Sequence, residues 1–161
     1  MSIEKVKEFF ERQGIQDRII EVEKSTATVE LAALALNCEP QRIAKTLSFH
    51  IGNQVMLIVV AGDAKIDNRK YRECFGDKPK MLNSEDTTSL VGHSVGGICP
   101  FAVNESVSVY LDDSLKRFKT VFPAAGSSNS GIELTLMELE KYSNYNRWVD
   151  VCKGWDSGKV D

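Results

Sequence analysis

The chain has 161 residues, of which 42% are hydrophobic and 27% are charged, and its formal net charge at pH 7 is -3. This size and balance predict one globular domain over residues 1–161 with a core of its own. The acidic balance argues against a protein that coats nucleic acid, because nonspecific phosphate binding depends on dense Lys and Arg. No apolar run approaches the roughly 18 to 20 residues of a membrane span, so we expect a soluble protein without a membrane partner.

The cysteines are widely spaced. Cys38, Cys74, Cys99 and Cys152 form no CxxC pair, and no signal peptide precedes them. This usage predicts free thiols in a reducing, cytoplasmic compartment. A zinc site needs closely spaced ligands, which neither the cysteines nor the two histidines provide, so we expect no metal.

The chain is expected to begin with two helices separated by a short strand. Hydrophobic spacing predicts an amphipathic helix over residues 2–13, ended by Gly14, and then a strand over residues 18–22. A second helix is expected to take Ser25 or Thr26 as its cap and to run to Leu36.

A β-hairpin follows, and it contains a lysine. Two apolar runs, residues 43–51 and 55–60, flank a Gly52-Asn53 turn. Lys45 lies in the first of them. It must either reach the solvent face or point into a polar cavity, because an unpaired buried ammonium is costly. The strand alone leaves both readings open.

The next stretch carries the densest positive charge. Residues 67–75 are predicted to form a helix ended by Gly76, and Ser84 is expected to cap another helix that reaches Val91. A basic helix face is usually only solvated, but it can also contact phosphate. The candidate phosphate contacts are Lys65, Arg69, Lys70 and Arg72.

The last third alternates short strands with loops. Strands are expected over 107–111, 120–122 and 132–134, with an edge strand over 148–151. Thr135 and Glu138 form a capping box that opens a helix. Short strands mixed with helices, one hairpin and no βαβ fingerprint predict an α+β (mixed α/β) fold, with a central, mixed, mostly antiparallel sheet surrounded by helices.

A glycine-rich loop covers residues 92–101. It holds a GxxxP spacing from Gly96 to Pro100, and it matches neither a dinucleotide-binding loop nor a P-loop. Glycines permit positive φ and close approach of a ligand to main-chain amides, which can stabilise a developing oxyanion. A plain structural turn is the alternative.

Taken together, these residues resemble the YbaK/EbsC aminoacyl-tRNA deacylases, a family also found as the inserted editing domain of bacterial prolyl-tRNA synthetases. The likeness spans the chain from the first helix to Leu139. It is carried by Ile43-Ala44-Lys45-Thr46-Leu47, Gly62-Asp63, the loop from Gly92 to Phe101, Tyr110-Leu111-Asp112, and Ala125-Gly126 followed by Ile132-Glu133-Leu134. The resemblance implies a YbaK-like fold and no metal or cofactor.

The implied activity is hydrolysis of the ester that joins a small mischarged amino acid to tRNA, with tRNA for proline as the expected acceptor. The implied partners are the aminoacyl-tRNA acceptor end and prolyl-tRNA synthetase. Lys45 would orient the ester, while main-chain amides of Gly97, Ile98 and Cys99 would support charge on oxygen. Substrate contacts would come from Thr46, His93, Gly96, Pro100, Ala124, Ala125 and Gly126.

The sequence departs from the cysteine-clearing branch of that family at two places. Ala124-Ala125-Gly126 replaces a serine and two glycines, and His93 replaces an aromatic residue. Alanine, cysteine and serine therefore all stay open as the cleared amino acid, and so does the oligomeric state. Two other functions compete: a thiol hydrolase with Cys99 as nucleophile and His93 as base, and a noncatalytic module that binds the aminoacyl end of tRNA or pairs with a synthetase.

Overall fold

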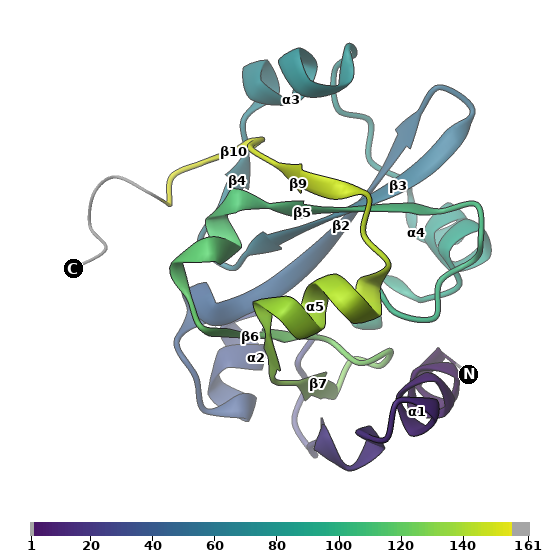
Figure 1. Ribbon diagram of the computed structural model, residues 1–161, viewed down its shortest axis with the longest axis vertical. Coiled ribbons are helices and arrows are strands. Elements are labelled where there is room, and N and C mark those ends of the chain that lie inside the picture. The colour runs from purple at the N-terminus through teal and green to yellow at the C-terminus, as the bar shows by residue number, and fades with distance from the viewer. Residues whose placement is uncertain (1, 156–161) are drawn as a thin grey trace.

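A six-stranded sheet forms the centre of the computed structural model, which describes residues 2–155 (Figure 1). The sheet is mixed, as predicted, but it is not mostly antiparallel. β2 pairs antiparallel with β3 and β6 with β8, while the three other neighbouring pairs are parallel. The strand order is β8 (Leu134–Thr135), β6 (Thr120–Pro123), β2 (Ile43–Ile51), β3 (Gln54–Ala61), β5 (Ser108–Asp112) and β9 (Arg147–Val149).

Two small antiparallel pairs and five α-helices surround this sheet in the described part of the chain. The pairs are β1 (Ile19–Glu21) with β7 (Ser130–Ile132), and β4 (Lys65–Ile66) with β10 (Cys152–Lys153). The helices are α1 (Ser2–Arg12), α2 (Val29–Leu36), α3 (Asn68–Phe75), α4 (Ser84–Asp86) and α5 (Leu136–Ser143).

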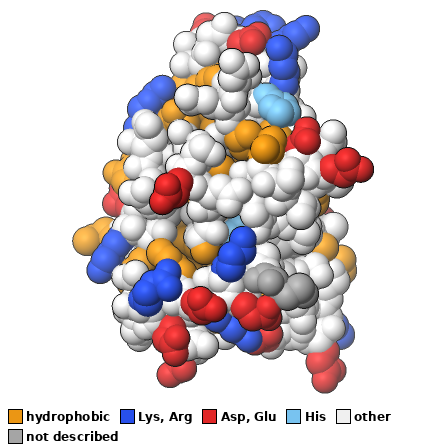
Figure 2. Space-filling model, turned by 90° about the vertical axis from the view of Figure 1, so that its right-hand side faces the viewer, with side chains coloured by type: hydrophobic (Ala, Val, Ile, Leu, Met, Phe, Trp, Pro, Cys, Tyr) orange, Lys and Arg blue, Asp and Glu red, His pale blue; other side chains and the backbone are white. Residues whose placement is uncertain are grey.

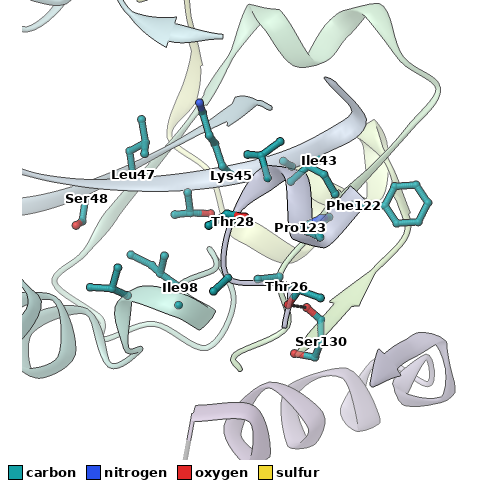
Figure 3. A pocket seen from close by; sticks show the side chains of 18 of the residues that line it. Thr26, Thr28, Ile43, Lys45, Leu47, Ser48, Ile98, Phe122, Pro123 and Ser130 are labelled. Carbon is teal, nitrogen blue, oxygen red and sulfur yellow. Dashed lines mark hydrogen bonds between the residues drawn. The ribbon is translucent and has the colours of Figure 1, made fainter. Parts of the chain in front are cut away.

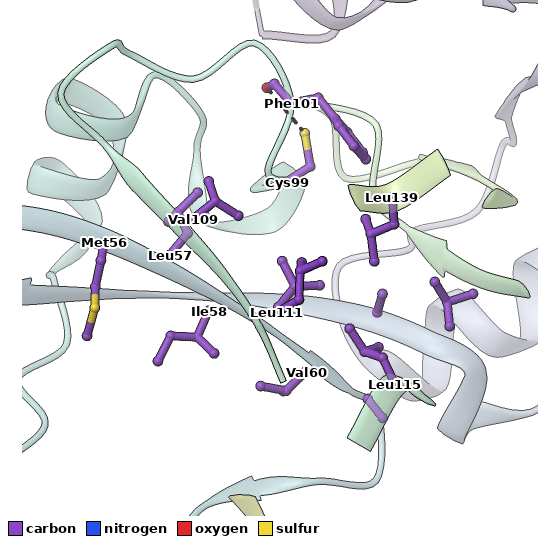
Figure 4. Packing of buried hydrophobic residues seen from close by; sticks show 14 of the residues in the cluster. Met56, Leu57, Ile58, Val60, Cys99, Phe101, Val109, Leu111, Leu115 and Leu139 are labelled. Atoms are coloured by element: carbon purple, nitrogen blue, oxygen red, sulfur yellow. Dashed lines mark hydrogen bonds between the residues drawn. The ribbon is translucent and has the colours of Figure 1, made fainter. Parts of the chain in front are cut away.

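The predicted hairpin is present and provides the centre of the core. β3 is buried from Met56 to Ala61, which explains why it reads as an unbroken apolar run. Leu57 and Ile58 lie in one cluster with Leu111 of β5 and Leu139 of α5 (Figure 4). This buried strand fixes the position of its neighbour β2, which carries Lys45.

Helix α1 packs against the glycine-rich loop. It buries Val6 and Phe10, and the Phe10 ring meets the Phe101 ring edge-on with their centroids 5.0 Å apart. The amphipathic helix predicted for residues 2–13 is therefore confirmed to within one residue, and it supports the loop from behind.

Two predicted helix caps are wrong by one or more residues. Thr28 caps α2, since its side chain accepts from Leu31 N, whereas Thr26 Oγ1 donates to the Ser130 carbonyl at 3.3 Å. Thr26 is held by a neighbouring loop and so is not free to cap. Asn83, not Ser84, caps α4, and a π-helical turn over Thr87–Val91 continues it.

The strand predicted over residues 132–134 is split at Glu133. β7 before it pairs with β1, and β8 after it pairs with β6. The chain changes partner at this point, and the Glu133 carboxylate accepts from Thr120 Oγ1 at 2.6 Å. The β4–β10 pair is an addition that the sequence pattern did not predict.

Candidate active site

A cavity of about 330 Å³ lies beside β2, within the size range of small-molecule sites. Of the residues predicted to form a site, Lys45, Thr46, Gly96, Ile98 and Ala124 line it (Figure 3). The loop before α2, the strand β6 and the end of the late small-residue loop provide the other walls.

The walls of the cavity are joined by hydrogen bonds between loops that are far apart in the sequence. Val22 N donates to the Asn129 carbonyl at 2.9 Å, and Thr26 N donates to the Ser128 carbonyl at 2.6 Å. These bonds hold residues 22–28 against the late loop. The cavity is thus a property of the folded chain and not of one motif.

Lys45 lies half-buried in β2, opposite Val60 of β3. Its ammonium points toward the Gly62 carbonyl, with Nζ and O 3.5 Å apart. Burial lowers the pKa of Lys45, and the nearby Cys152, Asp63 and Glu30 oppose that shift. The half-buried side chain ends at this main-chain carbonyl, and in Figure 3 it rises from the face of β2 away from Ile98.

The next residue along the strand faces the opposite way. In Figure 3 the Lys45 and Leu47 side chains rise from one face of β2, while Ser48 lies on the other face toward Ile98. By strand alternation Thr46 shares the face of Ser48. Thr46 is 7% exposed, and its Oγ1 has no hydrogen-bond partner within the described residues.

The glycines of the GxxxP loop serve packing between loops. Val95–Gly97 form a 3-10 turn, in which Gly97 N donates to the Ser94 carbonyl at 3.0 Å. A Cβ on Gly97 would lie 2.5 Å from Ser127 N, so only glycine fits against the late loop. The Gly97 amide, which was predicted to support an oxyanion, is engaged within this turn.

His93 lies behind the loop and not in the cavity. It is fully buried; its Nδ1 is 2.8 Å from Ser2 Oγ and its Nε2 is 2.7 Å from the Phe101 carbonyl. Burial lowers the pKa of His93, so the neutral ring donates from Nε2 to that carbonyl. The structure thus contradicts a direct substrate contact for His93 and shows a support for the loop.

Cys99 is close to His93, with Sγ 3.6 Å from Nε2, but neither residue lines the cavity. Complete burial raises the pKa of the Cys99 thiol to about 12. A nucleophilic thiol needs a lowered pKa and access to substrate, so this pair does not have the properties of a thiol hydrolase.

Three other residues predicted to contact substrate are buried outside the lining. Pro100 continues the loop inward, and Ala125 lies in the core. Gly126 has a φ of 98°, and its carbonyl oxygen lies 2.5 Å from Ser2 Oγ. A Cβ at Gly126 would lie 2.9 Å from the Ser2 carbonyl oxygen, so this glycine allows α1 to approach the late loop.

The basic residues lie away from these walls. Arg69, Lys70 and Arg72 are on α3 at the top of Figure 1, whereas α2 lies near the bottom. Lys70 Nζ donates to Asp150 at 3.1 Å and to the Cys152 carbonyl at 2.9 Å. On the face in Figure 2, acidic and basic side chains are interspersed and do not form a single basic field.

Several lining residues were missed from the sequence. Most of them have a small side chain or a hydroxyl, and they come from the loop before α2 and its first residue, from β2, from the π-helical turn, and from β6 and β7. The run of Ser and Thr before α2 was a usable signal, and so was the alternation that places Ser48 beside Thr46. These missed residues are Thr26, Ala27, Thr28, Val29, Ser48, Thr87, Phe122, Pro123 and Ser130.

The electrostatic character of the cavity is simple. Lys45 is the one charged residue among those that line it in the described part of the chain. Within residues 2–155 no three His, Cys, Asp or Glu side chains gather as a metal site would require. Over the same residues, none of the helices has the length and apolar character needed to cross a bilayer.

Comparison with known proteins places most of the chain in one family. Residues 23–142 match the model of the aminoacyl-tRNA editing domain. The chain is 50% identical over 157 residues to the uncharacterized protein YwhH of Bacillus subtilis, covering 97% of this chain and all of that protein. It is also 25% identical over 124 residues to the proline--tRNA ligase of Bacillus cytotoxicus, where it corresponds to 22% of the ligase.

Comparison with solved structures supports the same family. A candidate trans-editing enzyme for prolyl tRNA synthetase superimposes with a TM-score of 0.84 at 27% identity, covering 95% of this chain and 98% of that one. The hypothetical protein APE2540 gives a TM-score of 0.81 at 27% identity, with coverages of 92% and 99%. With its fold, its cavity and a family match over residues 23–142, the chain belongs to the aminoacyl-tRNA editing domain family.

Proposed function

We propose that the chain is a trans-editing deacylase, which acts as a single free-standing domain on a small amino acid wrongly attached to tRNA for proline. The observation that carries the proposal is the cavity between Lys45, Thr46 and the Gly96–Ile98 turn in a chain of the editing family. The likeness to proline--tRNA ligases supports tRNA for proline as the acceptor and the synthetase as a partner.

Hydrolysis of an aminoacyl ester requires few catalytic side chains. An aminoacyl ester is already activated, and the neighbouring ribose hydroxyl can help to position a water molecule, so placement and polarisation of the carbonyl are the main contributions. We assign Lys45 to the ester, because it is the one charged residue among those that line the described cavity. Ile98 borders the cavity directly after the engaged Gly97 amide, and its own amide is the candidate that remains from the glycine turn.

The size of the cavity favours a small amino acid. Ala27 and Ala124 give small walls, and the remaining space must also admit the terminal adenosine. Hydrophobic pockets separate ligands that differ by one methylene by only about 1–3 kcal/mol, so exclusion of proline depends on steric rejection of its ring. Alanine, cysteine and serine are the candidates for the cleared residue.

The basic residues of α3 are proposed to contact phosphates of the acceptor arm. Arg69 and Arg72 are exposed on α3, and Lys65 lies on the adjacent β4. Since α3 is distant from α2 in Figure 1, Arg69 and Arg72 would contact the stem and not the terminal adenosine, whereas Lys65 is close enough to Lys45 to lower its pKa.

The test is release of amino acid from tRNA for proline charged with alanine, cysteine, serine or proline, using wild-type protein and Lys45→Ala. We expect clearance of at least one small amino acid, sparing of prolyl-tRNA, and loss of activity in the variant. Survival of every charged tRNA with the wild-type protein would overturn the deacylase. Binding of the same tRNAs without turnover would indicate the noncatalytic module instead.

A further inference from the structure

One edge of β2 has a gap in its main-chain hydrogen bonding where it borders the cavity. β6 pairs with β2 at Ile43 and Ala44 only. Farther along the same edge, Leu82 N donates to the Ser48 carbonyl at 3.2 Å. Between these two contacts, within residues 2–155, nothing pairs with the main chain of Thr46 on that side.

The direction of the Thr46 main chain follows from strand alternation. Both Ser48 and His50 hydrogen-bond away from β3, since His50 N donates to the Lys80 carbonyl at 2.8 Å. Alternate residues of a strand direct their main-chain groups to the same side. The N–H and the C=O of Thr46 therefore both point into the gap, toward the cavity that Thr46 lines.

The side chain of Thr46 adds a third polar group. Its Oγ1 is buried and lacks a partner within the described residues. Folded proteins leave few buried polar groups unsatisfied, and each one requires an explanation. Three polar groups of a single residue at one cavity indicate a polar ligand that carries both donors and acceptors.

An aminoacyl ester has the matching groups. Its α-ammonium is a donor and its carbonyl an acceptor, the same combination that one residue of a strand offers. In a hydrogen-bonded antiparallel pair two residues exchange both bonds. No carboxylate lines the described cavity to receive the α-ammonium, so a main-chain carbonyl is the acceptor suited to it.

We propose that the aminoacyl group binds the edge of β2 as a one-residue antiparallel strand opposite Thr46. This inference depends on the proposed function. The α-ammonium donates to the Thr46 carbonyl, and the ester carbonyl accepts from Thr46 N–H. Because the pair is antiparallel, the ester oxygen and the ribose run back along β2 toward Lys45, and the amino-acid side chain lies beside Thr46 Oγ1.

The first test measures binding to acceptor-end oligonucleotides that carry stable 3′-amide analogues of alanine and of propionate. These two ligands differ only in the α-amine, and neither is hydrolysed. Loss of a hydrogen bond from a charged donor predicts propionyl binding about ten- to hundredfold weaker than alanyl binding. Equal affinities would overturn the pairing while leaving the deacylase intact. Failure of both to bind, together with no turnover of mischarged tRNA, would instead overturn the proposed function.

The second test changes the protein. Thr46→Pro removes the N–H that the sheet does not use, a change that strand edges accept. Thr46→Val removes only the hydroxyl, so it separates the contribution of Oγ1 from that of the main-chain N–H. We expect Thr46→Pro to bind both analogues at least about tenfold more weakly than Thr46→Val does. Equal binding by the two variants would show that the main-chain N–H of residue 46 does not bind the ligand. If Thr46→Pro does not fold, the comparison of the alanyl and propionyl analogues on the wild-type protein still tests the proposal.

Discussion

Two buried polar residues, Thr46 and His93, lie close to the same glycine turn but differ in how their polar atoms are satisfied. Thr46 lines the cavity, and its hydroxyl has no partner within the described residues. His93 lies behind the loop, and both of its ring nitrogens have partners. A residue whose polar atoms are already paired supports the fold, whereas one whose atoms are left open at a cavity can bind a ligand. This difference predicts that changes at the cavity alter catalysis and that changes at His93 alter stability.

The largest expected effect is at the cavity. Lys45→Met keeps the alkyl stem and removes the charge. We expect the rate of deacylation to fall by about a hundredfold or more, as when one stabilising donor is lost. The melting temperature should change little, because a half-buried charge is removed along with its desolvation cost. Single-turnover assays and thermal melts measure the two effects, and full activity in this variant would remove Lys45 from the mechanism.

A change at His93 should reduce stability and have little effect on the deacylation rate. His93→Leu removes the Nε2 donor of the Phe101 carbonyl and leaves it only the long contact with the Cys99 thiol. We expect the free energy of unfolding to fall by about 1–3 kcal/mol. The folded fraction should retain its rate within a few-fold. Urea denaturation of this variant beside Ser94→Ala, a change at an exposed neighbour, provides the comparison. A His93→Leu protein of unchanged stability but without activity would place His93 among the catalytic groups.

The contribution of His93 to stability can also be tested through the pH dependence of unfolding. Its folded pKa is lowered from 6.5, so below pH 6.5 the unfolded chain binds more protons than the folded one. The stability contributed by neutral His93 is therefore complete above pH 6.5 and declines as the pH falls toward the folded pKa. We expect wild-type stability to fall between pH 6.5 and 5 more steeply than that of His93→Leu. Parallel curves would show that the ring does not titrate with folding.

The smallest effect is expected at Cys99. Cys99→Ala should keep the deacylase rate within about twofold, because a buried thiol of raised pKa is not a nucleophile. In the native protein a thiol reagent should modify the half-buried Cys38 and Cys74 faster than the buried Cys99 and Cys152. Rapid labelling of Cys99, with activity lost at the same rate, would instead support a thiol hydrolase with Cys99 as its nucleophile.

The sequence predicted those parts of the fold whose signals are local. The hairpin was readable because an apolar run on each side of Gly52-Asn53 must pair, and α5 because Thr135 and Glu138 cap it reciprocally. The split at Glu133 was not readable, since it depends on which distant strands lie beside each half. Thr26 failed as a cap for the same reason, because its partner, Ser130, is more than one hundred residues away.

The same distinction between local signals and distant packing applies to the candidate site. Lys45 and Gly96 lie at the cavity, because a charged residue in a strand and a glycine turn are visible in the sequence. His93, Pro100 and Gly126 were predicted as substrate contacts from the same motifs, but they do not line the cavity. Which side of a loop faces a ligand depends on packing against α1, which no local pattern records.

The bonds between residues 22–28 and the late loop also have a consequence for synthesis of the protein. The first of these segments leaves the ribosome about a hundred residues before its partner at 128–130. The hairpin can form while the chain is still growing, but one wall of the cavity is absent until the late loop has emerged. A nascent chain that ends before residue 128 should therefore contain Lys45 in a folded strand and yet have no enclosed cavity, so substrate binding becomes available only near the end of translation.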